Sequence, residues 1–180
     1  MSSPIVVIGS LNMDLVVRTP RHPQPGETLL GSDFKTFPGG KGANQAVAAA
    51  RLGGEVRMVG RVGADAFGQV LLANLVRDKI DTTHVLTTPA AASGVALITL
   101  DEVGQNTIVV ASGANSLLSP PDILASEAAF TGAAVVLLQL ETPLETVACA
   151  VELARKNKVK VILNPAPAAA LSEKLLKQVD

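Results

Sequence analysis

The sequence predicts an α/β fold in which helices flank a wound, mostly parallel β-sheet and a small second β-sheet forms a lid over it. Short, continuous apolar runs recur at residues 5–8, 56–59, 133–138 and 159–163. Such runs are typical of strands buried on both faces of a parallel sheet. Helical segments separate most of these runs, which indicates the wound sheet. Other strand-like segments have no helix between them, and these predict the separate sheet.

The lid is predicted from strand-like segments that follow one another without a helix. These segments are residues 15–18, 28–30, 94–100 and 107–111. The last two flank Asp-Glu-Val-Gly at 101–104, a sequence that favours a hairpin. We therefore expect the lid at approximately residues 13–37 and 93–112, within one domain that spans residues 1–180.

A glycine-rich segment at 39–46 reads Gly-Gly-Lys-Gly-Ala-Asn-Gln-Ala. Glycine has no side chain to fill a core and loses backbone entropy when it is ordered. An alanine-rich helical stretch follows at 46–52, so the loop would lead into a helix N-terminus, whose free N–H groups can bind an anion or hydroxyl oxygens. The structural alternative is a tight turn in front of the helix.

Two common nucleotide-binding motifs are absent from this segment and from the end of the first strand. A Walker A loop needs G-x-x-x-x-G-K-[S/T], but Gly42 follows Lys41. The dinucleotide fingerprint G-x-G-x-x-G does not follow residues 5–8 either. A nucleotide-binding oxidoreductase is therefore disfavoured.

Three further segments are predicted to be helices. Residues 66–78 follow Asp65, an N-cap candidate, and carry apolar residues at helical spacing. Residues 121–129 are the second. The third begins at Thr142-Pro143-Leu144-Glu145, where threonine as N-cap, proline at N1 and glutamate at N3 predict a capping box. Its last turn, at 155–158, carries cations that suit the negative end of the helix dipole.

Polar residues follow three of the predicted strands at their carboxyl ends, where ligands bind in open parallel sheets. Together with the glycine-rich segment they predict a cluster of Asn12, Asp14, Lys41, Asn44, Glu141 and Asn164. Carboxylates accept hydrogen bonds from vicinal hydroxyls and amides both donate and accept, so a small polyol is the predicted ligand. Structural alternatives stay open: Asp14 as a turn residue, Glu141 as a solvated loop residue and Asn164 as a turn starter before proline.

The composition excludes several classes of partner. A net charge of −1 with interleaved signs gives no electrostatic footprint for nucleic acid or an anionic membrane. No apolar run reaches the roughly 18 residues that span a bilayer, and no signal segment begins the chain. One cysteine and two histidines argue against a disulfide framework and a zinc site. We expect a cytoplasmic protein that binds neither nucleic acid nor membrane.

Taken together, these motifs resemble those of the ribokinase-like family of sugar and nucleoside kinases. The matching segments, in the family's order, are G-S-L-N-M-D at 9–14, P-G-E-T at 25–28, G-G-K-G-A-N-Q-A at 39–46, G-x-D-x-F-G at 63–68, S-G-V-A-L-I at 93–98, G-A-N at 113–115, Q-L-E at 139–141 and N-P-A-P at 164–167. They run along essentially the whole chain. Within the family they are similar to the kinases of ribose rather than to adenosine kinases or fructokinases.

The resemblance implies transfer of the ATP γ-phosphate to the 5-hydroxyl of D-ribose. It implies Mg²⁺, activation by K⁺, an apolar wall from lid strand 94–100 and a homodimer formed through the lid. The residues that would bind the sugar are Asn12, Met13, Asp14, Gly40, Lys41, Gly42, Ala43, Asn44 and Glu141.

The family's catalytic segment, G-A-G-D, does not occur in the sequence, and neither does its N-E-x-E segment. The resemblance therefore implies that the catalytic aspartate and the residues that bind ATP and metal lie beyond Asp180. We expect an N-terminal portion of the fold, with one sheet edge unpaired. A kinase for another furanose or deoxyribose and a non-catalytic sugar-binding fragment remain alternatives.

Overall fold

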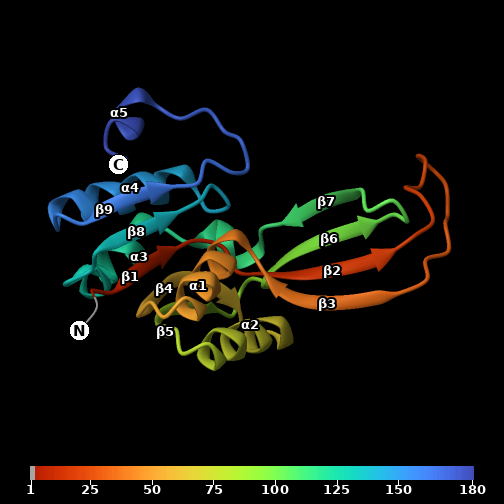
Figure 1. Cartoon of the computed structure of the whole chain (residues 1–180), viewed down its shortest axis with the longest axis horizontal. Helices are drawn as coiled ribbons and strands as arrows, with labels where there is room; N and C mark the ends of the chain where they lie inside the picture. The colour runs from red at the N-terminus through yellow and green to blue at the C-terminus, as the bar shows by residue number, and fades with distance from the viewer. Residues whose placement is uncertain (1–2) are drawn as a thin grey trace.

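A five-stranded parallel sheet forms the body of the molecule, in a computed structural model that describes residues 3–180 (Figure 1). The strands lie in the order β5-β4-β1-β8-β9 and all neighbours are parallel. Their bounds are β1 (Ile5–Ile8), β4 (Val56–Gly63), β5 (Asp81–Thr88), β8 (Val135–Leu138) and β9 (Lys160–Leu163). The predicted wound sheet is confirmed.

Helices cover both faces of this sheet. Helices α1 (Lys41–Arg51) and α2 (Ala66–Arg77) pack on one face, and α3 (Pro120–Ala125) and α4 (Leu144–Lys156) on the other. The short helices η1 (Gly113–Leu117), η2 (Glu127–Phe130) and α5 (Glu173–Leu176) complete the elements. No helix within residues 3–180 is long and apolar enough to cross a lipid bilayer.

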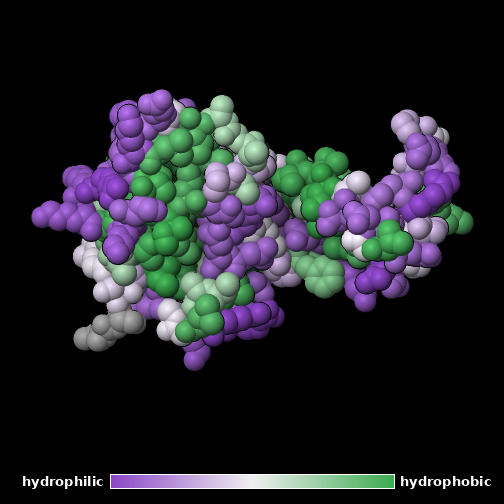
Figure 2. Space-filling model, turned by 45° about the horizontal axis from the view of Figure 1, so that its top comes forward, coloured by the Kyte–Doolittle hydropathy of each residue, from purple (hydrophilic) through white to green (hydrophobic). Residues whose placement is uncertain are grey.

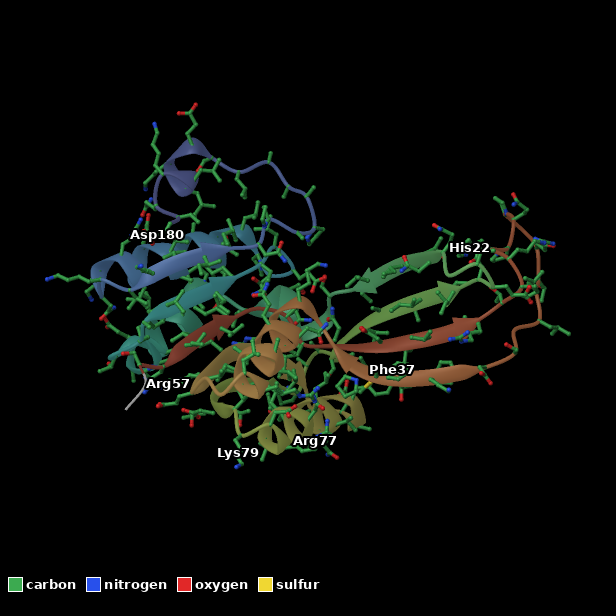
Figure 3. All side chains as sticks on the ribbon, in the orientation of Figure 1. His22, Phe37, Arg57, Arg77, Lys79 and Asp180 are labelled. Carbon is green, nitrogen blue, oxygen red and sulfur yellow. The ribbon has the colours of Figure 1, made fainter. Side chains whose placement is uncertain are left out.

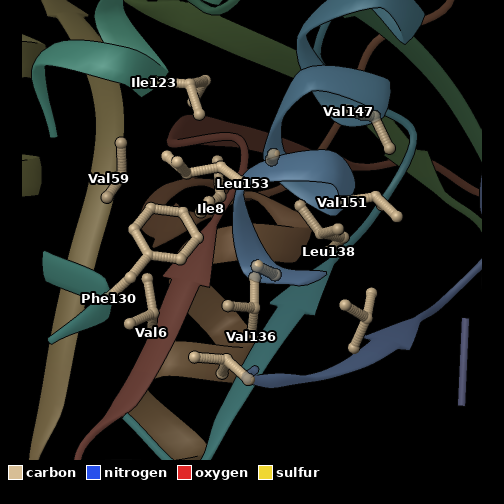
Figure 4. Close-up of a cluster of buried hydrophobic side chains, with 14 of the residues drawn as sticks. Val6, Ile8, Val59, Ile123, Phe130, Val136, Leu138, Val147, Val151 and Leu153 are labelled. Carbon is tan, nitrogen blue, oxygen red and sulfur yellow. The ribbon is translucent and has the colours of Figure 1, made fainter. Parts of the chain in front are cut away.

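The alternation of side chains along β1 supplies both halves of the core. Val6 and Ile8 point to the cluster under α3 and α4, whereas Val7 points to the cluster under α1 and α2. All three are fully buried. Figure 4 shows the first cluster, in which Phe130 and Leu153 close over the sheet. Because the strand is apolar on both faces, it reads as a continuous run in the sequence.

A second sheet projects from the body as the lid (Figure 1). Its strands are β2 (Asn12–Arg18), β3 (Phe34–Gly39), β6 (Gly94–Leu100) and β7 (Asn106–Ala111), in the order β3-β2-β6-β7. Strands β2 and β6 are parallel, and the other pairs are antiparallel. Asp14 lies opposite both Phe37 and Ala96, so these residues share one face of the lid.

One prediction about the strands was wrong, and one strand was not predicted. Residues 28–30 form no strand, and β2 pairs instead with β3, which leads directly into α1. Asn12 pairs with Gly39, so the register between β2 and β3 depends on the position of the glycine-rich segment. The strand propensities of single residues do not predict such a pairing. The sequence analysis also missed β5, because this edge strand is largely polar and buries only Val85 and Thr88.

The predicted capping box of α4 was also wrong. The helix begins at Leu144, its N-cap is Pro143 in an extended conformation, and no side chain caps it. Thr142 lies one residue too early to reach the free N–H groups. A capping box occurs instead at α3, where the carboxylate of Asp122 accepts a hydrogen bond of 2.8 Å from the backbone N–H of Ser119.

Strand β9 is the edge of the body sheet, and the last residue of the chain bonds to it. The backbone N–H of Asp180 donates to the carbonyl of Val161, and the Asp180 carboxylate accepts from the N–H of Val161, both at 2.9 Å. Figure 3 shows Asp180 beside this part of the sheet. These contacts satisfy two backbone groups that an edge strand otherwise exposes.

Asp65 connects the start of α2 to Ser93, the residue immediately before lid strand β6. As predicted, it caps α2 by accepting a hydrogen bond of 2.8 Å from the N–H of Gly68. It also accepts from the N–H and the hydroxyl of Ser93, immediately before β6, at 2.8 and 2.7 Å. Burial raises the pKa of Asp65, but the hydrogen bonds from Ser93 and Gly68 outweigh it, and the net effect is a lowered pKa.

We predict that Asp65→Ala lowers the free energy of unfolding by about 2 kcal/mol, because a helix cap and two bonds to Ser93 are lost together. Denaturant titration measures the change. Glu173→Ala, which removes an exposed carboxylate paired with Lys177, is the control and should change stability by less than about 0.5 kcal/mol. Equal effects of the two substitutions would contradict the role of Asp65.

Candidate functional site

A cavity of about 730 Å³ lies between the body and the root of the lid. The carboxyl ends of β1 and β8 and the N-terminus of α1 form its floor, and the lid strands β6 and β7 form an apolar wall. Its polar lining includes Asn12, Asp14, Lys41, Asn44, Asn115 and Glu141, and its apolar lining includes Ala96, Ile98, Ile108, Val110 and Leu140. The predicted edge of the sheet is therefore the floor of a real cavity.

The glycine-rich segment allows α1 to begin in direct contact with the end of β1. Gly40 has a φ of 92°, in the region that favours glycine, and a Cβ there would lie 2.7 Å from the backbone nitrogen of Asn12. A Cβ on Gly42 would lie 2.6 Å from the carbonyl carbon of Gly9. Side chains at either position would push the helix away from the strand. These glycines thus bring the first N–H groups of α1 to the cavity.

Glu141 is held at this helix N-terminus. Its Oε2 accepts hydrogen bonds from the backbone N–H of Lys41 at 3.1 Å and from the hydroxyl of Ser10 at 2.5 Å. The Nζ of Lys41 lies 3.9 Å from its Oε1. The carboxylate thus lies at the positive end of the helix dipole and beside the lysine. Glu141 therefore offers a fixed hydrogen-bond acceptor to the cavity.

Asp14 brings a second carboxylate to the same cavity. A Cβ on Gly39, in the neighbouring strand, would lie 2.3 Å from Asp14 Oδ2, so the carboxylate rests on the bare backbone of that glycine. Burial, and then the charge of Glu141, raise the pKa of Asp14. Hydrogen-bond donors stabilise two carboxylates that lie close together, and the hydroxyls of a polyol are such donors.

The structure brings most of the predicted site residues to the cavity. Asn12, Asp14, Gly40, Lys41, Asn44 and Glu141 line it. Met13, Gly42 and Ala43 do not. The side chain of Met13 points to the opposite face of β2 and is buried against the core under α1 and α2.

Gly42 and Ala43 contact Ser10 through their backbone N–H groups. The N–H of Gly42 donates to the hydroxyl of Ser10 at 3.4 Å, and the N–H of Ala43 donates to the carbonyl of Ser10 at 2.9 Å. Asn164 is exposed and lies outside the lining. Its backbone N–H bonds to the carbonyl of Leu138, which agrees with the structural alternative for this residue.

Sequence reasoning missed two polar residues of the site. Ser10 bonds to Glu141 and to the first turn of α1, and Asn115 contacts Asn12 from η1. Both lie inside motifs quoted above, G-S-L-N-M-D and G-A-N, which were the available signals. Their partners are distant in the chain, so the pairings were not visible in the sequence.

Comparisons with known proteins identify the family of the chain. The model of the pfkB family of carbohydrate kinases matches residues 2–180. A ribokinase of Haemophilus influenzae is 46% identical over 180 residues, which are 100% of this chain and 59% of that protein. A deoxyribokinase of Salmonella typhi is 45% identical over 164 residues, which cover 91% of this chain and 54% of that protein.

Solved structures show the same fold. Ribokinase from Thermotoga maritima is similar with a TM-score of 0.88 and 35% identity, over 99% of this chain and 58% of that one. Arabidopsis thaliana ribokinase, complexed with ribose and ATP, is similar with a TM-score of 0.86 and 32% identity, over 100% of this chain and 59% of that one.

The chain thus spans about 59% of the length of these ribokinases, and the expectation of a partial ribokinase-like fold is confirmed. The family model covers nearly all of the chain, and the TM-scores of 0.88 and 0.86 show that the fold is shared with the solved structures. This chain belongs to the pfkB family of carbohydrate kinases.

Proposed function

We propose that the complete protein transfers the γ-phosphate of ATP to the 5-hydroxyl of D-ribose, and that this chain carries the ribose-binding half of the site. The observation that carries the proposal is the convergence of Asp14 and Glu141, with Lys41, in one cavity roofed by apolar lid residues. Ribokinase relatives at 39–46% identity support the sugar. The cytoplasm, where ATP and free ribose meet, is the proposed compartment.

In this proposal, the residues of the chain bind and orient the sugar. Hydroxyls of ribose donate to the carboxylates of Asp14 and Glu141, while the side-chain amide of Asn44 contributes a donor. The side chains of Ala96 and Ile98 cover the sugar and exclude water. Fixing the acceptor hydroxyl in this way supplies the positioning on which phosphoryl transfer depends.

The proposal places ATP, its metal ions and the catalytic base outside this part of the protein. Within residues 3–180, no three His, Cys, Asp or Glu side chains are grouped so that they could hold a metal ion. We assign neither Mg²⁺ nor K⁺ to residues of this chain, and no catalytic step to them. When bound, Mg²⁺ neutralises charge on the phosphates.

A second candidate is a kinase for deoxyribose, which the deoxyribokinase relatives at 45% identity favour. Both sugars fit a cavity with acceptors and a largely apolar roof. A sugar-binding fragment without kinase activity is a third candidate. All three share the binding half of the site and differ in turnover and in the preferred sugar.

We further propose that the protein is a homodimer formed through the lid. The face of the lid that carries Asp14 also carries Phe37, Ile108 and Val110, which are 48%, 52% and 43% exposed. Figure 2 shows the lid as a narrow extension of the body with hydrophobic side chains on its surface. Exposed apolar side chains on a narrow sheet are typical of an interface. A second copy would cover them.

We predict that the complete protein converts D-ribose and ATP to ribose 5-phosphate and ADP, and that the 180-residue chain alone binds ribose without turnover. A coupled assay for ADP, run with ribose, 2-deoxyribose and other furanoses, measures turnover, and calorimetric titration with ribose measures binding by the 180-residue chain. Preference for deoxyribose would select the second candidate. If the complete protein phosphorylates none of these sugars, the kinase proposal is wrong.

We predict that Asp14→Asn and Glu141→Gln each weaken ribose binding by about 10- to 100-fold, because each replaces a charged acceptor with a neutral amide. Calorimetric titration of the complete protein measures the affinity. Asp33→Asn removes an exposed carboxylate from the lid and is the matched control, with unchanged binding. Ribose affinity as in the wild type for either variant would refute the assignment of that residue.

We predict that Phe37→Ser weakens self-association by about tenfold or more, since the exposed ring would lose its partner surface in the dimer. Figure 3 places Phe37 on β3, within the lid. Sedimentation velocity of the complete protein measures the association. Leu52→Ser, which changes an exposed apolar residue after α1, is the control. A wild-type monomer, or a dimer indifferent to Phe37→Ser, would contradict the proposed interface.

A further inference from the structure

Asn115 lines the cavity and makes three hydrogen bonds at the start of β2, two to Leu11 and one to Asn12. Its Oδ1 accepts from the backbone N–H of Leu11 at 2.9 Å, and its Nδ2 donates to the carbonyl of Leu11 at 3.0 Å. The same Nδ2 donates to Oδ1 of Asn12 at 2.8 Å. Asn115 is 1% exposed, so these bonds form away from bulk water. Its amide has no hydrogen left over for a ligand.

These bonds fix which way each amide points. A backbone N–H only donates and a carbonyl only accepts, so the two bonds to Leu11 determine the orientation of the Asn115 amide. The remaining hydrogen on its Nδ2 then requires an acceptor, which is Oδ1 of Asn12. The Asn12 amide is thereby fixed as well. Its Nδ2 has no hydrogen-bond partner among residues 3–180, and Asn12 lines the cavity.

The side chains of Asn12 and Asn115 occupy space that is free only because Gly94, the first residue of β6, has no side chain. A Cβ on Gly94 would lie 2.2 Å from Oδ1 of Asn12 and 2.3 Å from Nδ2 of Asn115. Gly94 is also the residue that pairs with Asn12 between β6 and β2. The two amides therefore meet where the lid strands leave the body, and the packing excludes other side chains from that point.

We propose that Asn115 is a positioning residue for the sugar site, which holds the Asn12 amide so that it presents N–H donors, and not its oxygen, to a ligand hydroxyl. This inference rests on the proposed function for the identity of the ligand. The cavity then offers complementary groups: carboxylate acceptors from Asp14 and Glu141 on one side, and an amide donor from Asn12 on another. A sugar hydroxyl acts as both donor and acceptor, so it can use both kinds of group.

A merely structural role for Asn115 predicts something different. Its bonds to Leu11 alone would support the connection between β1 and β2, and their loss would lower stability and disturb the cavity in general. Such damage would weaken binding whether or not Asn12 is present. Positioning through Asn12 instead predicts that the two residues act on ribose affinity as one unit.

The test is a double-mutant cycle on the complete protein. Ribose affinity is measured by calorimetry for the wild type, Asn12→Ala, Asn115→Ala and the double variant. We expect each single substitution to weaken binding by about 3- to 10-fold, and the double variant to bind no more weakly than Asn12→Ala. Multiplied effects in the double variant would overturn the inference. Asn164→Ala, at an exposed asparagine outside the cavity, should bind as the wild type does.

A second variant keeps the test decisive if Asn115→Ala does not fold. Asn12→Asp still accepts the bond from Asn115 but has no N–H for the ligand, so we expect it to fold and to lose ribose affinity. Unchanged affinity in Asn12→Asp would show that the donor is not used and would overturn the inference.

A ligand-free measurement separates this inference from the proposed function. In a crystal structure of Asn115→Ala, or of Asn115→Ser if the alanine variant does not fold, we expect the Asn12 amide to leave its position. An unmoved Asn12 amide would overturn the positioning role. If the wild type binds no ribose while the Asn12 amide still moves in the variant, the proposed function fails and the positioning role stands.

Discussion

The contact between the start of α1 and the end of β1 is the constraint on which the site depends. A helix N-terminus can approach a strand end this closely only if the facing residues have no side chains, and Gly9, Gly40 and Gly42 meet that condition. Ser10 fills the remaining gap with its hydroxyl and carbonyl, and both bond to the first turn of the helix. The N–H groups and dipole of α1 are thereby directed at the cavity.

Glu141 shows how this contact creates the chemistry of the site. A half-buried carboxylate loses hydrogen bonds to water, and burial is costly unless other donors take their place. Here the N–H of Lys41 and the hydroxyl of Ser10 are those donors. Among residues 3–180 no hydrogen-bond donor reaches the Asp14 carboxylate, and burial, followed by the charge of Glu141, raises its pKa. One carboxylate is thus hydrogen-bonded within the protein, and the other is open to the cavity.

Two polar networks hold the lid to the body where β2 and β6 begin. Asp65 links α2 to Ser93, and Asn115 links η1 to Leu11 and Asn12. Both networks are formed by residues distant in sequence and both end at β6 or its neighbour β2. The lid extends far from the body, so its position over the cavity depends on the stiffness of this short root rather than on broad packing.

The sequence by itself determined the class of fold, because strands buried on both faces are apolar throughout, as β1 and β8 are, and helical segments separate most of these runs. It also determined the helix that Asp65 caps, because this signal is local, and it predicted Asn12, Asp14 and Glu141, which line the cavity. Only the tertiary structure decided the pairing of β2 with β3, the missing cap of α4, the inward face of Met13 and the roles of Ser10 and Asn115. Each of these features depends on a contact between residues that are far apart in the sequence. Hydrogen bonds and close backbone contacts of this kind leave no periodic pattern in the residues that form them.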